Sequence, residues 1–415
     1  MATLSLCMIV KDEVENLPRA LASVRDLADE IVVIDTGSGD ATPTIAEEAG
    51  AKVNFLMWGD DFSVARNASL DQATQDWILV LDADETLTQA GDDFIRSIKE
   101  ERPMGKVQPA DLLLVTMMRR EIGANQSPYT QVSRLFRNLK TVKYARPYHE
   151  GVEDSVQALM SAEEHWQVAQ LGAVGIDHTG YGVAAIAAKD KFKRAQRIME
   201  KHLEAYPDDA YMANKLGALY TQSDAPEANH YEKALELLDR ALRSRNFDPM
   251  TEYELHYHRG IAYRHIEDKL PEAAAAYRSA IAVPIAGLLK LGAYLNLGAL
   301  LKMQGDLDGA MKQYEAAGRI DPTQPIIFLN LGVVHRARGY LEPAMRAYEY
   351  AISLDPNYSA AYQNLGVVLF KLGKLPQSKA AFEKAISLVE STDPAEAERL
   401  RQGLKSLKID DALGL

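Results

Sequence analysis

Residues 77–85 read Trp-Ile-Leu-Val-Leu-Asp-Ala-Asp-Glu, an apolar run that passes directly into carboxylates. The run Trp77–Leu81 is short, bulky and partly β-branched, which predicts a strand buried on both faces. Because side chains alternate along a strand, Asp82 and Asp84 are expected to project from the same face. Two such carboxylates repel unless a cation neutralises them, and hard oxygen ligands suit Mg²⁺ or Mn²⁺ together with a diphosphate. A strand that ends in a solvated acidic turn is the alternative interpretation.

The composition is that of an ordinary globular protein. The chain has 415 residues, of which 25% are charged and 47% hydrophobic, enough for about two or three domains. A formal net charge of −13 argues against a nucleic-acid or anionic-membrane partner. The single cysteine, Cys7, lies in an apolar run and is expected to be a buried core thiol. We expect a cytoplasmic protein without a transmembrane segment, because the first residues lack a basic signal-peptide region and no apolar run approaches the ~20 residues that span a bilayer.

The stretch belongs to a pattern of alternating strands and helices. Further strands are predicted at Leu4–Val10, Ile31–Ile34 and Lys52–Leu56, with helical spacing of apolar residues between them. This order predicts a mostly parallel sheet covered by helices, a Rossmann-like α/β fold. Ligands of such sheets bind outside the carboxyl ends of the strands.

Charged residues fall at that predicted edge: Lys11, Asp12, Glu13, Asp35, Asp82 and Asp84. The carboxylate of Asp35 can accept the imide N–H of uracil, and the glycines after it let the backbone approach a nucleotide. Capping of the following turn is the alternative role for Asp35. Arg66 lies near the start of a helix, where its guanidinium and the backbone N–H groups could face phosphate. The glycine-rich motifs of dinucleotide and phosphate-loop sites are missing from the sequence.

Four short motifs occur in chain order: Lys11-Asp12-Glu13, Val33-Ile34-Asp35-Thr36-Gly37-Ser38, Ala65-Arg66-Asn67 and Leu81-Asp82-Ala83-Asp84-Glu85. This series resembles the inverting family-2 glycosyltransferases of GT-A fold, over about residues 4–181. The resemblance implies that Asp35 contacts the nucleotide base and Asp82 the ribose or the metal. It implies that Asp84 binds a divalent metal, Mn²⁺ or Mg²⁺, that bridges the diphosphate and acts as a Lewis acid on the leaving group.

The same resemblance gives roles to two residues further along the chain. His178 matches a late histidine that similar enzymes use as a metal ligand, and a hydrogen-bonding role is the alternative. An inverting transfer needs one general base that takes the acceptor proton. Glu150 is the candidate, because the pair His149-Glu150 looks like the acceptor-side motif of these enzymes; a structural partner of His149 or of an arginine is the alternative role. The usual motif is an acidic pair, so Glu153 and Asp154 stay open as bases.

After about residue 184 the strand signals end and a repeat begins. Asn-Leu-Gly recurs at an interval of 34 residues, with its glycines at Gly298, Gly332 and Gly366. A later aromatic residue and an alanine recur at the same interval, and the pattern closely resembles the tetratricopeptide repeat (TPR). The predicted organisation is a GT-A domain over 1–185 and an all-α TPR superhelix over 186–415. Within the superhelix we expect a connecting helix at about 189–206, five repeats over about 210–390 and a capping helix at about 394–407.

The asparagines of this motif, Asn296, Asn330 and Asn364, occupy equivalent positions in successive repeats. Each amide can donate to and accept from a peptide bond. The series resembles the asparagine ladder of the O-linked N-acetylglucosamine transferase repeats, which implies a peptide or protein partner in the groove. The alternative is that asparagine is simply common at this position of the repeat.

These observations predict a metal-dependent inverting glycosyltransferase. It would move a sugar from a nucleoside-diphosphate donor, such as a UDP-sugar, to a peptide or protein acceptor held by the repeats. A transferase for a polysaccharide or a lipid-linked glycan is one alternative. A TPR scaffold with an inactive nucleotide-binding domain is another, but it predicts an eroded acidic cluster, and Asp35, Asp82, Asp84 and His178 are all present. A nucleotidyltransferase would need a basic glycine-rich loop near the first strand, which residues 8–16 lack.

Overall fold

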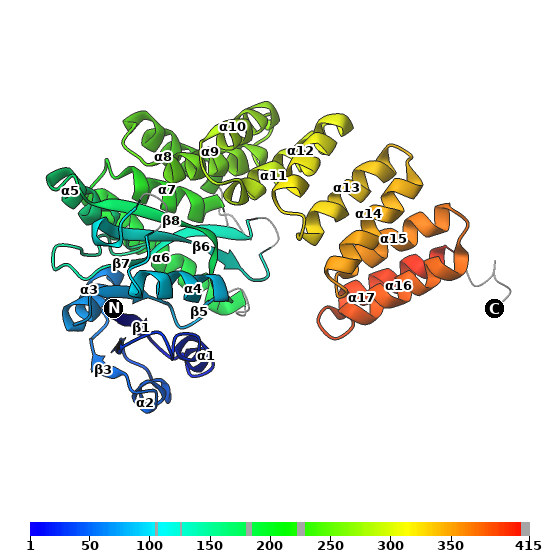
Figure 1. Ribbon diagram of the computed structural model, residues 1–415. Helices are drawn as coiled ribbons and strands as arrows, with labels where there is room; N and C mark the ends of the chain where they lie inside the picture. The colour runs from blue at the N-terminus through cyan, green and yellow to red at the C-terminus, as the bar shows by residue number, and fades with distance from the viewer. Residues whose placement is uncertain (104–106, 125–126, 180–184, 222–228, 408–415) are drawn as a thin grey trace. The chain divides into compact units, whose positions relative to one another are not determined.

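The computed structural model describes residues 1–103, 107–124, 127–179, 185–221 and 229–407 (Figure 1). The chain divides into two compact units, Met1–Thr251 and Glu252–Leu415. The boundary predicted after residue 185 was placed where the sequence pattern changes, whereas the compact units are defined by packing. The predicted boundary stays a prediction. Tyr181, where the resemblance was expected to end, lies outside the described residues.

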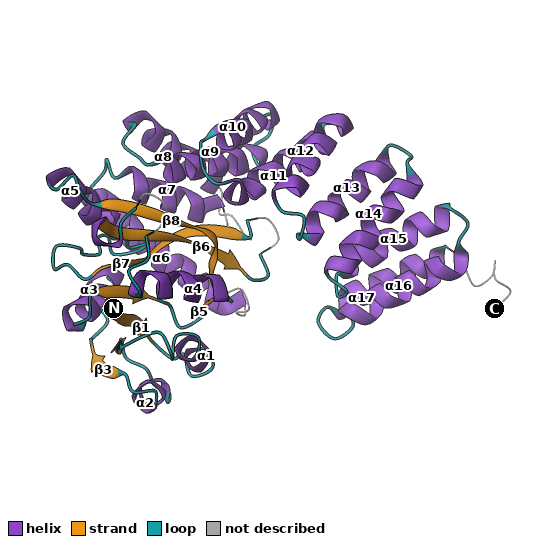
Figure 2. Cartoon of the chain, viewed as in Figure 1, coloured by secondary structure: helices purple, strands orange, loops and turns teal. Residues whose placement is uncertain are grey.

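A mixed sheet with the strand order β3-β2-β1-β4-β7-β6-β8-β5 organises the first unit (Figure 2). Its parallel half consists of β1 (Leu4–Val10), β2 (Glu30–Asp35), β3 (Lys52–Phe55) and β4 (Trp77–Val80). The other half consists of β5 (Glu85–Leu87), β6 (Leu112–Glu121), β7 (Tyr129–Arg137) and β8 (Gln167–His178). In that half β7 runs antiparallel to β4 and β6, β8 is parallel to β6, and β5 is antiparallel to β8. The α/β fold predicted from the sequence is confirmed.

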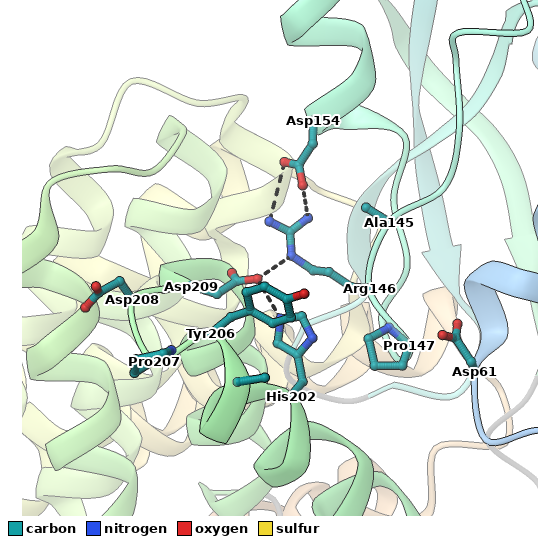
Figure 3. Close-up of a pocket in the computed structure, with 11 residues that line it drawn as sticks. Asp61, Ala145, Arg146, Pro147, Asp154, His202, Tyr206, Pro207, Asp208 and Asp209 are labelled. Carbon is teal, nitrogen blue, oxygen red and sulfur yellow. Dashed lines mark hydrogen bonds and ion pairs between the residues drawn. The ribbon is translucent and has the colours of Figure 1, made fainter.

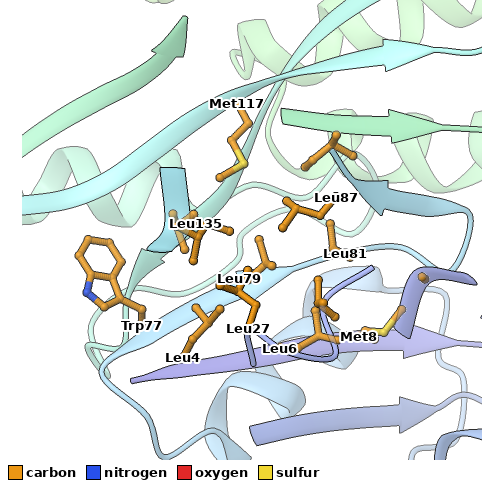
Figure 4. Packing of buried hydrophobic residues seen from close by; sticks show 14 of the residues in the cluster. Leu4, Leu6, Met8, Leu27, Trp77, Leu79, Leu81, Leu87, Met117 and Leu135 are labelled. Carbon is orange, nitrogen blue, oxygen red and sulfur yellow. The ribbon is translucent and has the colours of Figure 1, made fainter. Parts of the chain in front are cut away.

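Helices cover both faces of this sheet. α1 (Leu17–Ala22), α2 (Thr42–Glu48) and α4 (Gln89–Lys99) pack on one face, and α3 (Phe62–Gln72) and α5 (Glu153–Ala162) on the other. Successive side chains of β4 therefore enter different cores. Leu79 packs with Leu6 and Met8 in the first core (Figure 4), and Val80 packs with Cys7, buried as predicted, in the second. Each such side chain contributes about 1.5–3 kcal/mol.

β4 ends at Val80, earlier than the sequence pattern suggested. Asp82 and Asp84 lie in the turn that leads to β5, where the backbone N–H of Glu85 donates to the Asp82 carbonyl at 3.0 Å. The prediction that both aspartates lie on the strand was therefore wrong, and the strand alternation from which their common face was predicted does not apply to them.

Three further helices belong to the first unit: α6 (Ala185–Ala205), α7 (Ala210–Thr221) and α8 (His230–Ser244). Ion pairs connect α6 and the residue before α7 to the α/β part of the unit. Arg197 of α6 binds Asp60 at 2.7 Å, and Arg146 binds Asp209 at 2.9 Å.

The second unit consists of paired helices, and α9 (Pro249–Arg264) spans the division between the units. The helices that follow are α10 (Leu270–Ala282), α11 (Leu291–Met303), α12 (Leu307–Ile320), α13 (Pro325–Ala337), α14 (Leu341–Leu354), α15 (Ser359–Lys371), α16 (Leu375–Val389) and α17 (Pro394–Ser406). The repeat glycines let paired helices approach, since a Cβ at Gly298 would lie 2.7 Å from the Tyr314 ring. In the described part of the chain no helix is both long and apolar enough to cross a bilayer.

Candidate active site

The loops after β1 and β2 are tied together at the carboxyl edge of the sheet. The backbone N–H of Gly39 donates to the Asp12 carboxylate at 2.7 Å, and the Asp12 N–H donates to the Ser38 hydroxyl at 3.0 Å. Asp12 has a φ of 55°, in the left-handed region, while Lys11 beside it is exposed. The first motif and the second therefore form one loop pair.

Asp35 organises the turn after β2. Its Oδ1 accepts from the backbone N–H groups of Gly37 at 2.9 Å and Ser38 at 3.0 Å, and the Ser38 hydroxyl donates to Oδ2 at 2.5 Å. Gly37 has a φ of 106°, which side chains rarely tolerate. Asp35 is only 4% exposed. Asp35 therefore has the turn-capping role that was its alternative interpretation. Its contact with a nucleotide base stays a prediction.

Arg66 joins the sheet edge to the predicted acceptor side. It is 3% exposed on α3, its Nη2 donates to Asp82, and its Nε donates to Glu150 at 2.9 Å. One guanidinium thus holds the strand-end aspartate and the candidate base together, although Glu150 lies far along the chain. Nη1, the third nitrogen, is buried and has no hydrogen-bond partner among the described residues, and the contact of Arg66 with phosphate stays a prediction.

Two further charges complete the surroundings of Asp82. Arg134 on β7 donates to Asp82 at 2.5 Å and to Glu85 at 2.8 Å, and Arg119 on β6 donates to the fully buried Glu85 at 2.7 Å. Burial alone would raise the pKa of Asp82, but Arg134 and Arg66 outweigh it and hold that pKa well below its ordinary value. Asp82 is therefore an anion at neutral pH. Glu85 and Arg134 were given no role from the sequence, although Glu85 directly follows the aspartates of the fourth motif.

Asp84 lies beside His178 at the end of β8. The His178 Nε2 and the Asp84 Oδ2 are 3.1 Å apart, and the other ring nitrogen, Nδ1, is 2.5 Å from Glu121. Burial lowers the pKa of His178, but hydrogen bonds to Asp84 and Glu121 outweigh it and raise that pKa to about 9. Glu121 was not predicted from the sequence; it is paired with His178 in the β6–β8 ladder.

Asp84 and His178 fit a metal ion that is shared with a substrate. A carboxylate oxygen and an imidazole nitrogen suit Mn²⁺ or Mg²⁺, and Glu121 orients the imidazole as carboxylates do in metal sites. Among the described residues no group of three or more His, Cys, Asp or Glu side chains is placed to hold a metal. The remaining ligands would come from phosphate and water, as is usual for Mg²⁺ in nucleotide enzymes. Because ligand imidazole is neutral, binding would release the His178 proton.

The charge environment of Glu13 depends on Asp82 and Asp84. Burial raises the pKa of Glu13, the hydrogen bond from Asn16 lowers it, and the negative charges of Asp84 and Asp82 raise it further. The structure thus brings the first motif and the aspartates after β4 to one edge, as predicted from the strand order.

The two alternative bases have different surroundings. Asp154 forms an ion pair with Arg146 at 2.7 Å in a pocket of about 760 Å³, and Glu153 is exposed. Figure 3 shows Arg146 between Asp154 and Asp209, with His202 also bound to Asp209 at 3.0 Å. Neither acid is linked to Arg66 and Asp82 in the way that Glu150 is.

The three asparagines of the repeats are not equivalent in the structure. Asn296 is 4% exposed, and its amide donates to the Tyr257 hydroxyl at 3.2 Å. The amide of Asn364 donates to the Ala360 carbonyl of its own helix at 2.9 Å, and Asn330 is half-buried. Asn296 in particular is not open to a partner, so a continuous ladder is not formed.

Comparison with known proteins identifies both parts of the chain. The family model described as glycosyl transferase family 2 matches residues 5–101, and models of the TPR or tetratricopeptide repeat match residues 223–287, 298–337, 334–373 and 359–390. Together with the fold and the acidic sheet edge, these matches define a glycosyltransferase domain joined to helical repeats. A TPR repeat-containing protein of Synechococcus elongatus is 42% identical over 317 residues, which cover 76% of this chain and 74% of that protein. The chain belongs with this TPR repeat-containing protein, and it carries a glycosyl transferase family 2 domain at residues 5–101.

Two other proteins resemble one part of the chain each. An uncharacterized glycosyltransferase of Rickettsia bellii is 28% identical over 198 residues, which cover 48% of this chain and 67% of that protein. The solved structure of YrrB, described as a TPR protein with an unusual peptide-binding site, has a TM-score of 0.37 and 19% identity. The matched region covers 49% of this chain and 97% of the YrrB chain.

Proposed function

We propose that the chain is a metal-dependent inverting glycosyltransferase. It moves a sugar from a nucleoside-diphosphate donor, such as a UDP-sugar, to a hydroxyl or thiol of a peptide or protein acceptor held by the repeats. The observation that carries this proposal is the Arg66 bridge, which places Glu150 beside Asp82 at the ligand-binding edge of the sheet.

The donor is assigned to the edge formed by β1, β2 and β4. The turn around Asp35 faces the base, and Asp82 faces the ribose. Asp84 and His178 would hold the divalent metal, which when bound neutralises charge on the leaving nucleoside diphosphate.

Glu150 is assigned to the acceptor. Its Oε1 accepts the hydrogen bond from Arg66, so Oε2 is the oxygen to which we assign the acceptor proton. The guanidinium fixes the carboxylate in position through a charge-assisted hydrogen bond. As the acceptor oxygen or sulfur attacks the anomeric carbon from the side opposite the leaving group, its proton passes to Glu150 and the configuration inverts.

The test is Glu150→Gln, with Glu153→Gln and Asp154→Asn as matched controls. Glutamine keeps the hydrogen bond from Arg66 but cannot take a proton. We expect unchanged nucleotide affinity and a loss of transfer of about 10²–10⁴-fold in Glu150→Gln, with small effects in the controls. Transfer would be followed as nucleoside diphosphate released from a panel of sugar donors. Full activity in Glu150→Gln, with loss in one of the controls, would move the base to that residue.

A further inference from the structure

Three cations occupy the same position in successive repeats of the second unit. Each lies four residues after the glycine of a first helix: Arg264 after Gly260 in α9, Lys302 after Gly298 in α11, and Arg336 after Gly332 in α13. All three side chains are half-buried. Because the position recurs, the cations form a row across the first helices, which we call the basic row.

The basic row has no carboxylate partner within the described part of the chain. Other cations of this unit are paired: Lys269 binds Glu272 and Arg338 binds Asp308, each at 2.7 Å. The charges of the row also act on one another, since burial lowers the pKa of Lys302 and the charges of Arg336 and Arg264 lower it further. Half-buried like charges without counter-ions are unfavourable, and an anionic ligand would relieve that cost.

A tyrosine accompanies each cation. Tyr277, Tyr314 and Tyr348 come from the second helices, and their fully buried rings pack on the repeat glycines. The hydroxyls of Tyr277 and Tyr314 have no hydrogen-bond partner among the described residues. Burial raises the pKa of both, and the charge of Arg264 lowers it in part.

The last repeat lacks both members of this arrangement. Phe370 stands where the three preceding repeats have a cation, and Phe382 stands where they have tyrosine. Phenylalanine packs on Gly366 as tyrosine does on the other glycines. Packing therefore does not require the hydroxyl, and a hydroxyl that is buried without a partner is unfavourable. The cation and the tyrosine hydroxyl are therefore absent from the same repeat.

We propose that Arg264, Lys302 and Arg336 form a docking row for an acidic peptide segment of a partner protein. Guanidinium and ammonium groups form charge-assisted hydrogen bonds with carboxylates. The chain as a whole carries a formal charge of −13, which repels a long polyanion such as a nucleic acid, whereas a short acidic segment meets mainly the local positive charge. The docking does not depend on sugar transfer, so its failure and the failure of the proposed function are distinguishable.

The test uses the full chain and fluorescence anisotropy of a labelled oligoglutamate peptide, without donor or metal. Oligolysine and oligoserine peptides are the charge controls, and an oligothymidine competes for the site. We expect oligoglutamate alone to bind and the triple variant Arg264→Gln, Lys302→Gln, Arg336→Gln to weaken binding about tenfold or more.

The matched control removes the same charge from exposed cations of the second helices, in the triple variant Lys312→Gln, Arg319→Gln, Lys384→Gln. We expect its binding to be unchanged. No binding of oligoglutamate, tighter binding of oligothymidine, or equal loss in the control variant would each overturn the proposal. Circular dichroism checks folding, and if the row variant does not fold, the three single variants replace it, each expected to weaken binding about two- to threefold.

Discussion

Arg66 shows how one residue can define a site. Its guanidinium is buried, yet it carries hydrogen bonds to carboxylates from two distant segments, Asp82 after β4 and Glu150 before α5. A buried cation of this kind is tolerated only when carboxylates compensate its charge. Arg66 therefore positions Asp82 and Glu150, and their negative charges in turn compensate its buried positive charge.

Glu30 is a second buried carboxylate, and it makes stability depend on pH. It accepts from Ser5, Lys52 and Thr74 at the amino end of β2. Burial would raise its pKa, but the bonds from Lys52 and Ser5 outweigh it and lower the pKa from 4.5 to about 2. A lowered folded-state pKa means that the stabilisation is complete above the ordinary value and is lost as the pH falls towards the folded-state value.

We therefore predict that Glu30→Gln loses on the order of 2 kcal/mol of unfolding free energy at about pH 7. The difference from the wild type should shrink as the pH falls from 4.5 towards 2. Urea denaturation at about pH 7 and at about pH 3 measures both quantities. A gap that is the same at the two pH values would contradict the account of Glu30.

At the scale of elements, the repeat glycines set how closely paired helices approach. A Cβ at Gly298 of α11 would lie 2.7 Å from the ring of Tyr314, which is fully buried and cannot move away. Gly403 of α17 is exposed, and a Cβ there would meet nothing within 4 Å.

Gly298→Ala should therefore destabilise the protein by about 1–3 kcal/mol, because the helices of the pair must separate. Gly403→Ala should be neutral or stabilising by up to about 1 kcal/mol, since alanine is the better helix former. Thermal unfolding of the two variants compares them directly. Equal midpoints would mean that the helix pair does not depend on the glycine.

The sequence predicted elements better than it predicted the site. β1 was predicted with its observed bounds, because an apolar run between two cores leaves little choice. The predicted placement of Asp82 and Asp84 on the strand was wrong, because the end of β4 is fixed by turn contacts that no local pattern reveals. Long-range pairs were equally hidden: Arg66 meets a residue 84 positions away, and His178 meets one 94 positions away.

At the scale of the whole molecule, the first compact unit includes helices that the sequence pattern assigned to the repeats. The pairs Arg197–Asp60 and Arg146–Asp209 hold α6 and the start of α7 against the α/β part. The sequence pattern of a helix shows which face is apolar but not which neighbouring element covers that face. The boundary between two compact units can therefore lie at a different residue from the change in sequence pattern.

This division predicts how the chain can be cut. A fragment of residues 1–251 should unfold cooperatively, whereas a fragment of residues 1–185 should have a lower melting temperature and be digested faster by protease. The shorter fragment loses both ion pairs and the helices that carry them. Equal melting temperatures of the two fragments would place the functional boundary after residue 185.

The central claim is that the acidic edge binds a sugar-nucleotide donor through a shared metal. Calorimetric titration of nucleoside diphosphates, with and without Mn²⁺, tests it on the wild type and on Asp84→Ala. We predict tight, metal-dependent binding of one nucleotide by the wild type and loss of the metal dependence in Asp84→Ala, because Asp84 and His178 are the proposed ligands. Absence of binding to every nucleotide, or the same metal-dependent affinity in both proteins, would contradict the claim.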